Sequence, residues 1–159
     1  QARWSCLGTA YPILGMGWSN SLKWKDLTVA FTLRASIGGK VYNQMRTIYE
    51  NITELGQKNI LASWLNNTQF TGDITYCDLY LEDASYLKMD NLSLAYDFHF
   101  DNRIIHGVNV YFTAQNVFTV TGYSGVDPEV GLGGLTPGIE GLSYYPRTRV
   151  FTLGVKLKF

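Results

Sequence analysis

Carboxylates and aromatic rings gather in one stretch of the chain, between Gly122 and Tyr145. Together, such side chains can bind sugar hydroxyls, peptide amides or calcium. A structural interpretation also fits, because Asp127-Pro128 and the glycines that follow favour turns, and tyrosines form girdles at membrane interfaces. No EF-hand spacing is present, so calcium rests on residue type alone. The candidate residues for contact with a substrate or a partner protein are Tyr123, Asp127, Glu129, Glu140, Tyr144 and Tyr145.

The other reactive side chains form no catalytic or metal motif. Cys6 and Cys77 lie far apart with no CxxC spacing, which argues against zinc, iron-sulfur and redox sites and leaves a disulfide between them open. His99 and His106 flank a short turn containing Arg103, where we expect solvated side chains. There is no Ser-His-Asp arrangement, supported carboxylate pair or phosphate loop, so we expect neither enzymatic activity nor a cofactor.

Five stretches in which apolar and polar residues alternate must position these side chains, because alternation is the pattern of β-strands. The second stretch alternates over eleven positions, with Leu27, Val29 and Phe31 against Thr28, Ala30 and Thr32. A tight turn at Lys25-Asp26 precedes it. The stretches are Gly15 to Trp24, Leu27 to Ile37, Ala84 to Phe98, Val108 to Gln115 with a continuation towards Thr121, and Phe151 to Phe159.

Composition also favours β-structure with little water-exposed surface. Charged residues are 16% of the chain, against about 25% in globular proteins, and aromatic residues reach 14%. The formal net charge of +0 argues against nucleic acid as a partner. No run of about 20 apolar residues occurs, so we expect no transmembrane helix. The chain starts at Gln1 without a signal peptide, which we interpret as a fragment of a longer protein.

The connections between the stretches alternate between short and long. Outer-membrane barrels have short periplasmic turns and long extracellular loops, and this pattern predicts such a barrel. Both long connections then lie outside the cell. Five strands cannot close a barrel, and an open sheet edge in lipid leaves backbone groups unpaired, so the other strands must come from sequence outside this chain. Within the first long connection, apolar spacing between Gln44 and Asn66 predicts one or two short helices.

In a barrel of this kind the apolar face meets lipid and the polar face meets the lumen. The polar positions of the strands therefore predict a set of side chains that face the lumen. These are Arg34, Asn91, Asp97, Asn109, Tyr111 and Gln115.

Several segments resemble the closing region of SusC/RagA-like TonB-dependent transporters. They are SYLKMDNLSLAYDF from Ser85, GVNVYFTAQNVFTVTGYSGVDPEV from Gly107, and the final YYPRTRVFTLGVKLKF from Tyr144. Residues 17–43 resemble the hairpin that precedes them in the family. The motifs follow the family's order over nearly the whole chain, residues 1–159.

The resemblance implies an all-β, transmembrane antiparallel β-barrel of 22 strands, of which this chain gives about the last five, with long extracellular loops. It implies a TonB-energised importer of an oligosaccharide or peptide, in which the N-terminal plug and the segment that contacts the TonB complex lie outside this chain. It also implies a SusD-like surface lipoprotein as partner, with Gly38 to Asp83 and Gly122 to Tyr145 as its contacts. The terminal Phe159 resembles the signature that directs barrel assembly, although an ordinary last strand would end in the same way.

Two other classes fit part of the pattern. A passive porin or structural barrel needs only the alternation and the unequal connections, and the presence of a plug would distinguish it from an importer. A secreted β-sandwich would bury Leu27 to Ile37 in a core and fold in water without detergent.

Overall fold

The computed structural model describes residues 5–67, 77–101, 105–130 and 135–159 of the 159-residue chain. The chain folds into two compact units, which we call the sheet unit and the loop unit. The loop unit joins the two long connections to the N-terminal residues. The sheet unit comprises Gly15–Ser36, Tyr86–Val120 and Arg147–Phe159, and the loop unit comprises Gln1–Leu14, Ile37–Ser85 and Thr121–Pro146.

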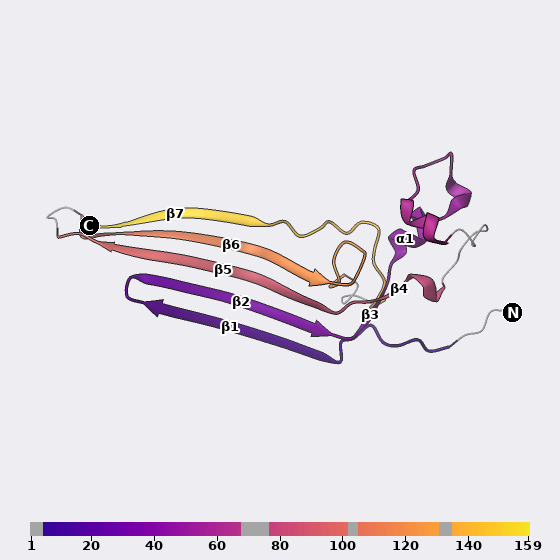
Figure 1. The fold of residues 1–159 in the computed structure, drawn as a ribbon, viewed down its shortest axis with the longest axis horizontal. Helices are drawn as coiled ribbons and strands as arrows, with labels where there is room; N and C mark the ends of the chain where they lie inside the picture. The colour runs from indigo at the N-terminus through magenta and orange to yellow at the C-terminus, as the bar shows by residue number, and fades with distance from the viewer. Residues whose placement is uncertain (1–4, 68–76, 102–104, 131–134) are drawn as a thin grey trace. The chain divides into compact units, whose positions relative to one another are not determined.

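The sheet unit is one sheet of five strands in the order β1-β2-β5-β6-β7 (Figure 1). All five strands predicted from alternation are confirmed, and the largest offset at the start of a strand is the third, which begins at Tyr86 instead of Ala84. Period-two patterning with turn residues at the ends was therefore a sufficient signal. The strands are β1 (Leu14–Trp24), β2 (Leu27–Ile37), β5 (Tyr86–His99), β6 (Gly107–Thr121) and β7 (Val150–Lys158).

Neighbouring strands of the sheet run antiparallel where their register is defined. β2 pairs with β5 from Leu27 opposite Tyr96 to Ser36 opposite Tyr86. β6 pairs with β7 from Gly107 opposite Lys158 to Gln115 opposite Val150. The two short connections therefore lie at one end of the sheet, and both long connections leave from the strand ends at the other.

The β1–β2 connection is a tight turn, and the β5–β6 connection is described only at its two ends. Lys25, in the β1–β2 turn, has a positive φ of 52°, which the two-residue hairpin requires. At the end of β5, the Phe100 amide donates to the His106 carbonyl over 3.2 Å. Arg103, which we placed in this second turn from the sequence, lies outside the described residues.

One face of the sheet is apolar and exposed. The edge of the Trp18 ring meets Phe31 across β1 and β2, with ring centroids 5.2 Å apart. On β7 the side chain of Leu153 is 74% exposed, and its alternate neighbours Phe151 and Val155 are exposed as well. A β-sandwich needs a second sheet packed over this face. Among the described residues the only other sheet is the two-stranded β3–β4, so the described residues do not form such a sandwich.

The described part of the loop unit contains a two-stranded sheet and four short helical segments. β3 (Lys40–Tyr42) pairs antiparallel with β4 (Leu81–Asp83). Short helices were predicted between Gln44 and Asn66, and three short helical segments are present there. No described helix has both the length and the apolar composition needed to cross a membrane. The helical segments are α1 (Gln44–Tyr49), η1 (Ile52–Glu54), η2 (Ala62–Asn67) and η3 (Asp78–Tyr80).

The two long connections share one small core. Val41 and Ala84 from the first connection cluster with Tyr123 and Val130 from the second, and Tyr144 packs against them. The segment around Ile139 also joins the edge of β3. There the Tyr42 amide donates to the Gly138 carbonyl over 2.7 Å, and the Glu140 amide donates to the Tyr42 carbonyl over 3.1 Å.

Candidate functional site

The side chains on the polar face of the sheet are held by neighbours from adjacent strands. Arg34 on β2 forms a two-pronged ion pair with Asp90 on β5, in which Nη2 donates to Oδ1 over 2.9 Å and Nε donates to Oδ2. Lys88, opposite Arg34, is only 2% exposed and its ammonium lies 5.0 Å from the centre of the Tyr86 ring. This end of the polar face therefore carries a compact group of opposite charges.

A β-bulge places both Asp90 and Asn91 on this polar face. The β2–β5 register shifts between Thr32 and Leu33, where Asn91 pairs with Thr32 and Met89 pairs with Leu33. Asp90 is the extra residue, and an extra residue reverses the alternation. The sequence carries the signal, since the apolar positions change from odd at Met89 to even from Leu92 onwards, but we did not interpret it as a bulge.

At the other end of the sheet, Asp97 links two further strands. Asn109 Nδ2 donates to Asp97 Oδ1 over 3.0 Å, and the Lys158 ammonium lies 3.4 Å from the same oxygen. The strands β5, β6 and β7 are therefore joined on the polar face by one carboxylate. Asn109 and Asp97, both predicted for this face, lie in contact.

Tyr111 and Gly154 form a close pair between β6 and β7. Gly154 lies opposite Tyr111, and a Cβ atom at Gly154 would stand 2.2 Å from Cζ of the ring, so the ring covers the glycine. The Lys156 ammonium lies 5.2 Å from the centre of the same ring. Gln115 is exposed at the last position of this register, opposite Val150.

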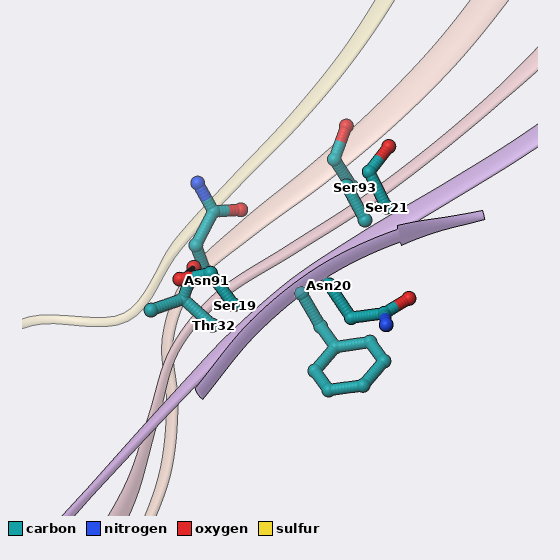
Figure 2. Close-up of a pocket in the computed structure, with 8 residues that line it drawn as sticks. Ser19, Asn20, Ser21, Thr32, Asn91 and Ser93 are labelled. Atoms are coloured by element: carbon teal, nitrogen blue, oxygen red, sulfur yellow. Dashed lines mark hydrogen bonds between the residues drawn. The ribbon is translucent and has the colours of Figure 1, made fainter. Parts of the chain in front are cut away.

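A shallow depression of about 300 Å³ lies beside β1, β2 and β5. Figure 2 shows Ser19, Thr32 and Asn91 grouped together on one side of β1, with Asn20 on the opposite side. The Ser19 and Thr32 hydroxyl oxygens are 3.1 Å apart. Ser21 and Ser93 complete the polar lining, so this depression offers small neutral hydroxyl and amide groups.

In the loop unit, most of the predicted contact residues bond to one another. The Tyr123 hydroxyl donates to Glu140 Oε2 over 2.9 Å, and the Val126 amide donates to Glu140 Oε1 over 3.1 Å. Glu140 is fully buried. Burial, together with the Glu140 carboxylate, raises the pKa of Tyr123 well above its ordinary value. Tyr123 and Glu140 therefore hold the second connection together from within.

Asp127 caps a turn in the way its sequence context suggested. Its Oδ1 accepts from the Glu129 amide over 2.9 Å, and its Oδ2 accepts from the Tyr144 hydroxyl over 3.4 Å. Asp127 is buried, Glu129 and Tyr144 are half-buried, and Tyr145 is 78% exposed. Of the six predicted contacts, Tyr145 offers the most side-chain surface, and a role in substrate binding stays a prediction for all six.

Another carboxylate, which sequence reasoning missed, is that of Glu82 on β4, which is largely buried. Glu82 Oε1 accepts from Asn43 Nδ2 over 3.1 Å, from Arg46 Nη1 over 2.8 Å and from the Ser124 hydroxyl over 2.7 Å. Its Oε2 accepts from the Ser124 amide over 2.7 Å. Burial works to raise the pKa of Glu82, but these bonds outweigh it and lower the pKa below the usual value.

Arg46 connects Glu82 to the carboxylate of Glu50. Its Nε donates to Glu50 Oε1 over 2.7 Å, and its guanidinium lies 5.4 Å from the centre of the Tyr80 ring. The hydrogen bond to Glu50 is the main cause that raises the pKa of Arg46. Burial raises the pKa of Tyr80 to about 12, with a further contribution from Glu50. The hydroxyl of Tyr80 is buried without a hydrogen-bond partner within the described part of the chain.

The remaining reactive residues stand apart. Cys6 and Cys77 are free thiols. His99 Nδ1 lies 3.4 Å from Asp26 Oδ1, at the turn end of the sheet. Within residues 5–67, 77–101, 105–130 and 135–159, no group of three or more His, Cys, Asp or Glu side chains is arranged to hold a metal ion. The loop calcium stays a prediction from residue type.

Comparisons of the sequence and the structure with known proteins show which family the chain belongs to. No protein-family model matches the chain. The TonB-dependent receptor SusC of Bacteroides thetaiotaomicron is 32% identical over 156 residues, which is 91% of this chain and 15% of that receptor. TonB-dependent receptor P3 of Formosa agariphila is 29% identical over 175 residues, which is 96% of this chain and 17% of the relative. A solved structure of the RagAB peptide importer in its closed-closed state matches the whole chain with a TM-score of 0.80 and 26% identity.

This chain is part of a SusC/RagA-like TonB-dependent receptor. It spans 15% of the length of SusC and 19% of the matched RagAB chain. The antiparallel sheet described above is thus an all-β fragment of a SusC-like barrel. The named relatives are receptors and importers rather than enzymes, which fits the absence of a catalytic motif in the sequence.

Proposed function

We propose that this chain forms part of the wall and two outer loops of an outer-membrane barrel that actively imports a nutrient. The whole barrel has 22 strands in this proposal, and the chain contributes the last five of them. The strands absent here complete the barrel beside β1 and β7, which are the two edge strands of the sheet. Import is energised through TonB by an N-terminal region that precedes this chain.

The observation that carries the proposal is the single-layer sheet with two unlike faces. Exposed Leu153, Val155 and Leu157 lie on one face of β7, while Lys156 and Lys158 lie on the other. In water, an uncovered apolar face costs about 25 cal/mol for each Å² exposed. Lipid removes that cost, and the polar face then lines a lumen.

The proposed cargo is an oligosaccharide or a peptide. The polar face near β1 offers Ser19, Thr32 and Asn91, neutral groups that exchange hydrogen bonds with hydroxyls and amides alike. A peptide cargo is supported by the RagAB match, because that importer is named for peptides. The chain contributes only part of the lumen, so the plug and the other loops determine the choice between the two.

The proposed partners are the TonB complex and a SusD-like surface lipoprotein. The lipoprotein contacts the loop unit, where Leu65 on η2, Leu142 and Tyr145 are exposed. Apolar and aromatic side chains of this kind are enriched in the cores of protein interfaces.

Uptake by the source bacterium tests the proposal. A strain that lacks the full-length receptor should fail to take up one labelled class, either oligosaccharides or peptides, and the intact gene should restore uptake. A protonophore should abolish the restored uptake, because TonB coupling needs the proton gradient. Uptake that persists with the protonophore would support the passive porin instead.

Affinity purification tests location and partners. A tag inserted between Gly131 and Gly134 of the full-length receptor should recover, from detergent-solubilised membranes, a surface lipoprotein and peptides of an N-terminal plug. The control carries the same tag at the C-terminus of an unrelated outer-membrane barrel. Recovery of the receptor in the soluble fraction would exclude the membrane assignment.

A further inference from the structure

The two long connections of the loop unit meet at one carboxylate. Glu82 lies near the end of the first connection, and Ser124 lies near the start of the second, 42 positions later. Ser124 gives Glu82 both its hydroxyl and its backbone amide, each over 2.7 Å. Asn43, which is fully buried, donates to the Ser124 hydroxyl over 3.2 Å and to Glu82 over 3.1 Å. Three residues from two connections thus close a small ring of hydrogen bonds.

The carboxylate needs donors from both connections at once. The Glu82 side chain is only 13% exposed, and a buried carboxylate costs several kcal/mol unless it is fully hydrogen-bonded. Arg46 and Asn43 supply part of the compensation from the first connection, and Ser124 supplies the rest from the second. If the second connection loses order, Glu82 is left largely buried without the two donors of Ser124, and if the first connection loses order, Ser124 loses the acceptor of its hydroxyl and amide.

Further hydrogen bonds near the ring also join the two connections. The Thr121 hydroxyl donates to the carbonyl of Ser85, three residues after Glu82, over 2.7 Å. The pairing of Tyr42 with Gly138 and Glu140 adds two further bonds between the connections. Packing and backbone pairing hold the connections close, while Glu82 makes their order interdependent.

We propose that Glu82 is a clasp that makes the two outer loops one cooperative unit, which orders and disorders as a whole. Glu82 is a positioning residue in this assignment, because it acts on the second loop through Ser124 and does not touch cargo. The second loop carries Asp127, Glu129 and Tyr145, so the first loop determines where these candidate contacts stand. The clasp does not depend on transport and can be tested without knowing the cargo.

Hydrogen exchange of the full-length receptor, read by mass spectrometry, tests the clasp. Glu82→Ala should speed exchange of amides in the second loop, residues 121–130 and 135–146, by about tenfold or more, the size expected for losing hydrogen bonds to a charged group. Ser124→Ala should speed exchange in the first loop around β3 and α1. Ser124→Thr keeps the hydroxyl and should leave the first loop protected.

The control is Glu54→Ala, in the same loop as Glu82. Glu54 pairs with Lys58 one turn away over 3.3 Å, so its loss should affect only the first loop. Amides of β5 and β6 should keep their protection in every variant. Faster exchange confined to the mutated loop in both Glu82→Ala and Ser124→Ala would overturn the proposal. If the Glu82→Ala receptor does not accumulate, the Ser124→Ala and Ser124→Thr pair decides alone.

Discussion

Among the acidic side chains of the loop unit, Glu140, Glu50 and Glu82 point inward and are paired within the unit, as Asp127 is. Glu140 bonds to Tyr123, Glu50 bonds to Arg46, and Glu82 bonds to both connections. Carboxylates in such positions stabilise a fold only while all their donors are present, because an unpaired buried charge is costly. At the scale of single residues, the acidic groups of these loops therefore act first as structural parts.

Removing the Tyr123 hydroxyl tests whether Glu140 has this structural role. Tyr123→Phe keeps the ring in the core but leaves Glu140 Oε2 without the Tyr123 donor, which should cost about 1–3 kcal/mol locally. The Val126 amide, which bonds to the other oxygen, should then exchange roughly ten to a hundred times faster in the full-length receptor. Tyr145→Phe is the matched control, because Tyr145 is exposed and its loss should change nothing. Equal exchange in both variants would show that the Tyr123 hydroxyl does not stabilise the loop.

Acid should loosen the loop unit through Glu82. The pKa of Glu82 is lowered in the folded chain, so its contribution to stability is complete above the usual value of 4.5 and is lost as the pH falls through the lower, folded value. Arg46, Asn43 and Ser124 all face the carboxylate, and Arg46 remains charged throughout. Proteolysis of the loops by pepsin should therefore accelerate as the pH falls below about 4.5.

Comparing two variants separates the effect of Glu82 on the pH dependence of proteolysis from the effects of other carboxylates. Glu82→Gln cannot ionise and should show a loop that is already loosened at neutral pH and changes less with acid. Glu54→Gln, which alters an exposed local pair, should follow the unmodified receptor. Identical pH profiles for Glu82→Gln and the unmodified receptor would contradict the assignment.

At the scale of elements, the strands follow from the sequence and the loop helices only partly. Alternation and turn residues locate β2 at Leu27–Ile37 as predicted. The one or two short helices expected between Gln44 and Asn66 are present as three short segments, α1, η1 and η2, and they stay short for local reasons. The Asn51 side chain accepts from the Thr53 amide and starts a new short turn, and Gly56 has a φ of +96°, outside the helical region.

Two features of the elements had no usable signal or a signal that we missed. The bulge at Asp90 was visible as a change of phase between Met89 and Leu92. The Glu82–Ser124 contact was not visible, because the partners are 42 residues apart and neither belongs to a motif. Contacts between loops depend on tertiary packing, which local spacing does not encode.

The pairing of β6 with β7 should depend on Gly154. In Gly154→Ala the new methyl group would stand 2.2 Å from the Tyr111 ring, so the ring must move or the strands must separate. We expect a lower fraction of folded receptor, measured by its heat-modifiable migration in gels. Adding Tyr111→Ala should remove the clash, so the two substitutions should be non-additive. Strictly additive losses would show that the ring does not cover the glycine. Val155→Ala, which shortens an exposed side chain on the same strand, is the control.

At the scale of the whole molecule, the chain is a small part of a larger receptor. It spans under a fifth of the SusC and RagAB chains that it matches. The five-stranded sheet leaves both edge strands without a partner among the described residues, and its apolar face is uncovered. Both features are explained if the sheet is a segment of a barrel wall whose neighbouring strands come from other parts of the receptor sequence.

Which face of the sheet meets lipid is the central claim, and spin labels along β7 test it most directly. In a full-length receptor carrying Cys6→Ser and Cys77→Ser, single labels at Phe151, Leu153, Val155 and Leu157 should collide with lipid-dissolved oxygen. Labels at Thr152, Lys156 and Lys158 should collide with a water-soluble nickel complex instead. A period-two alternation of this sense supports the barrel wall, whereas water accessibility at Leu153 and Val155, or no alternation along β7, would contradict it.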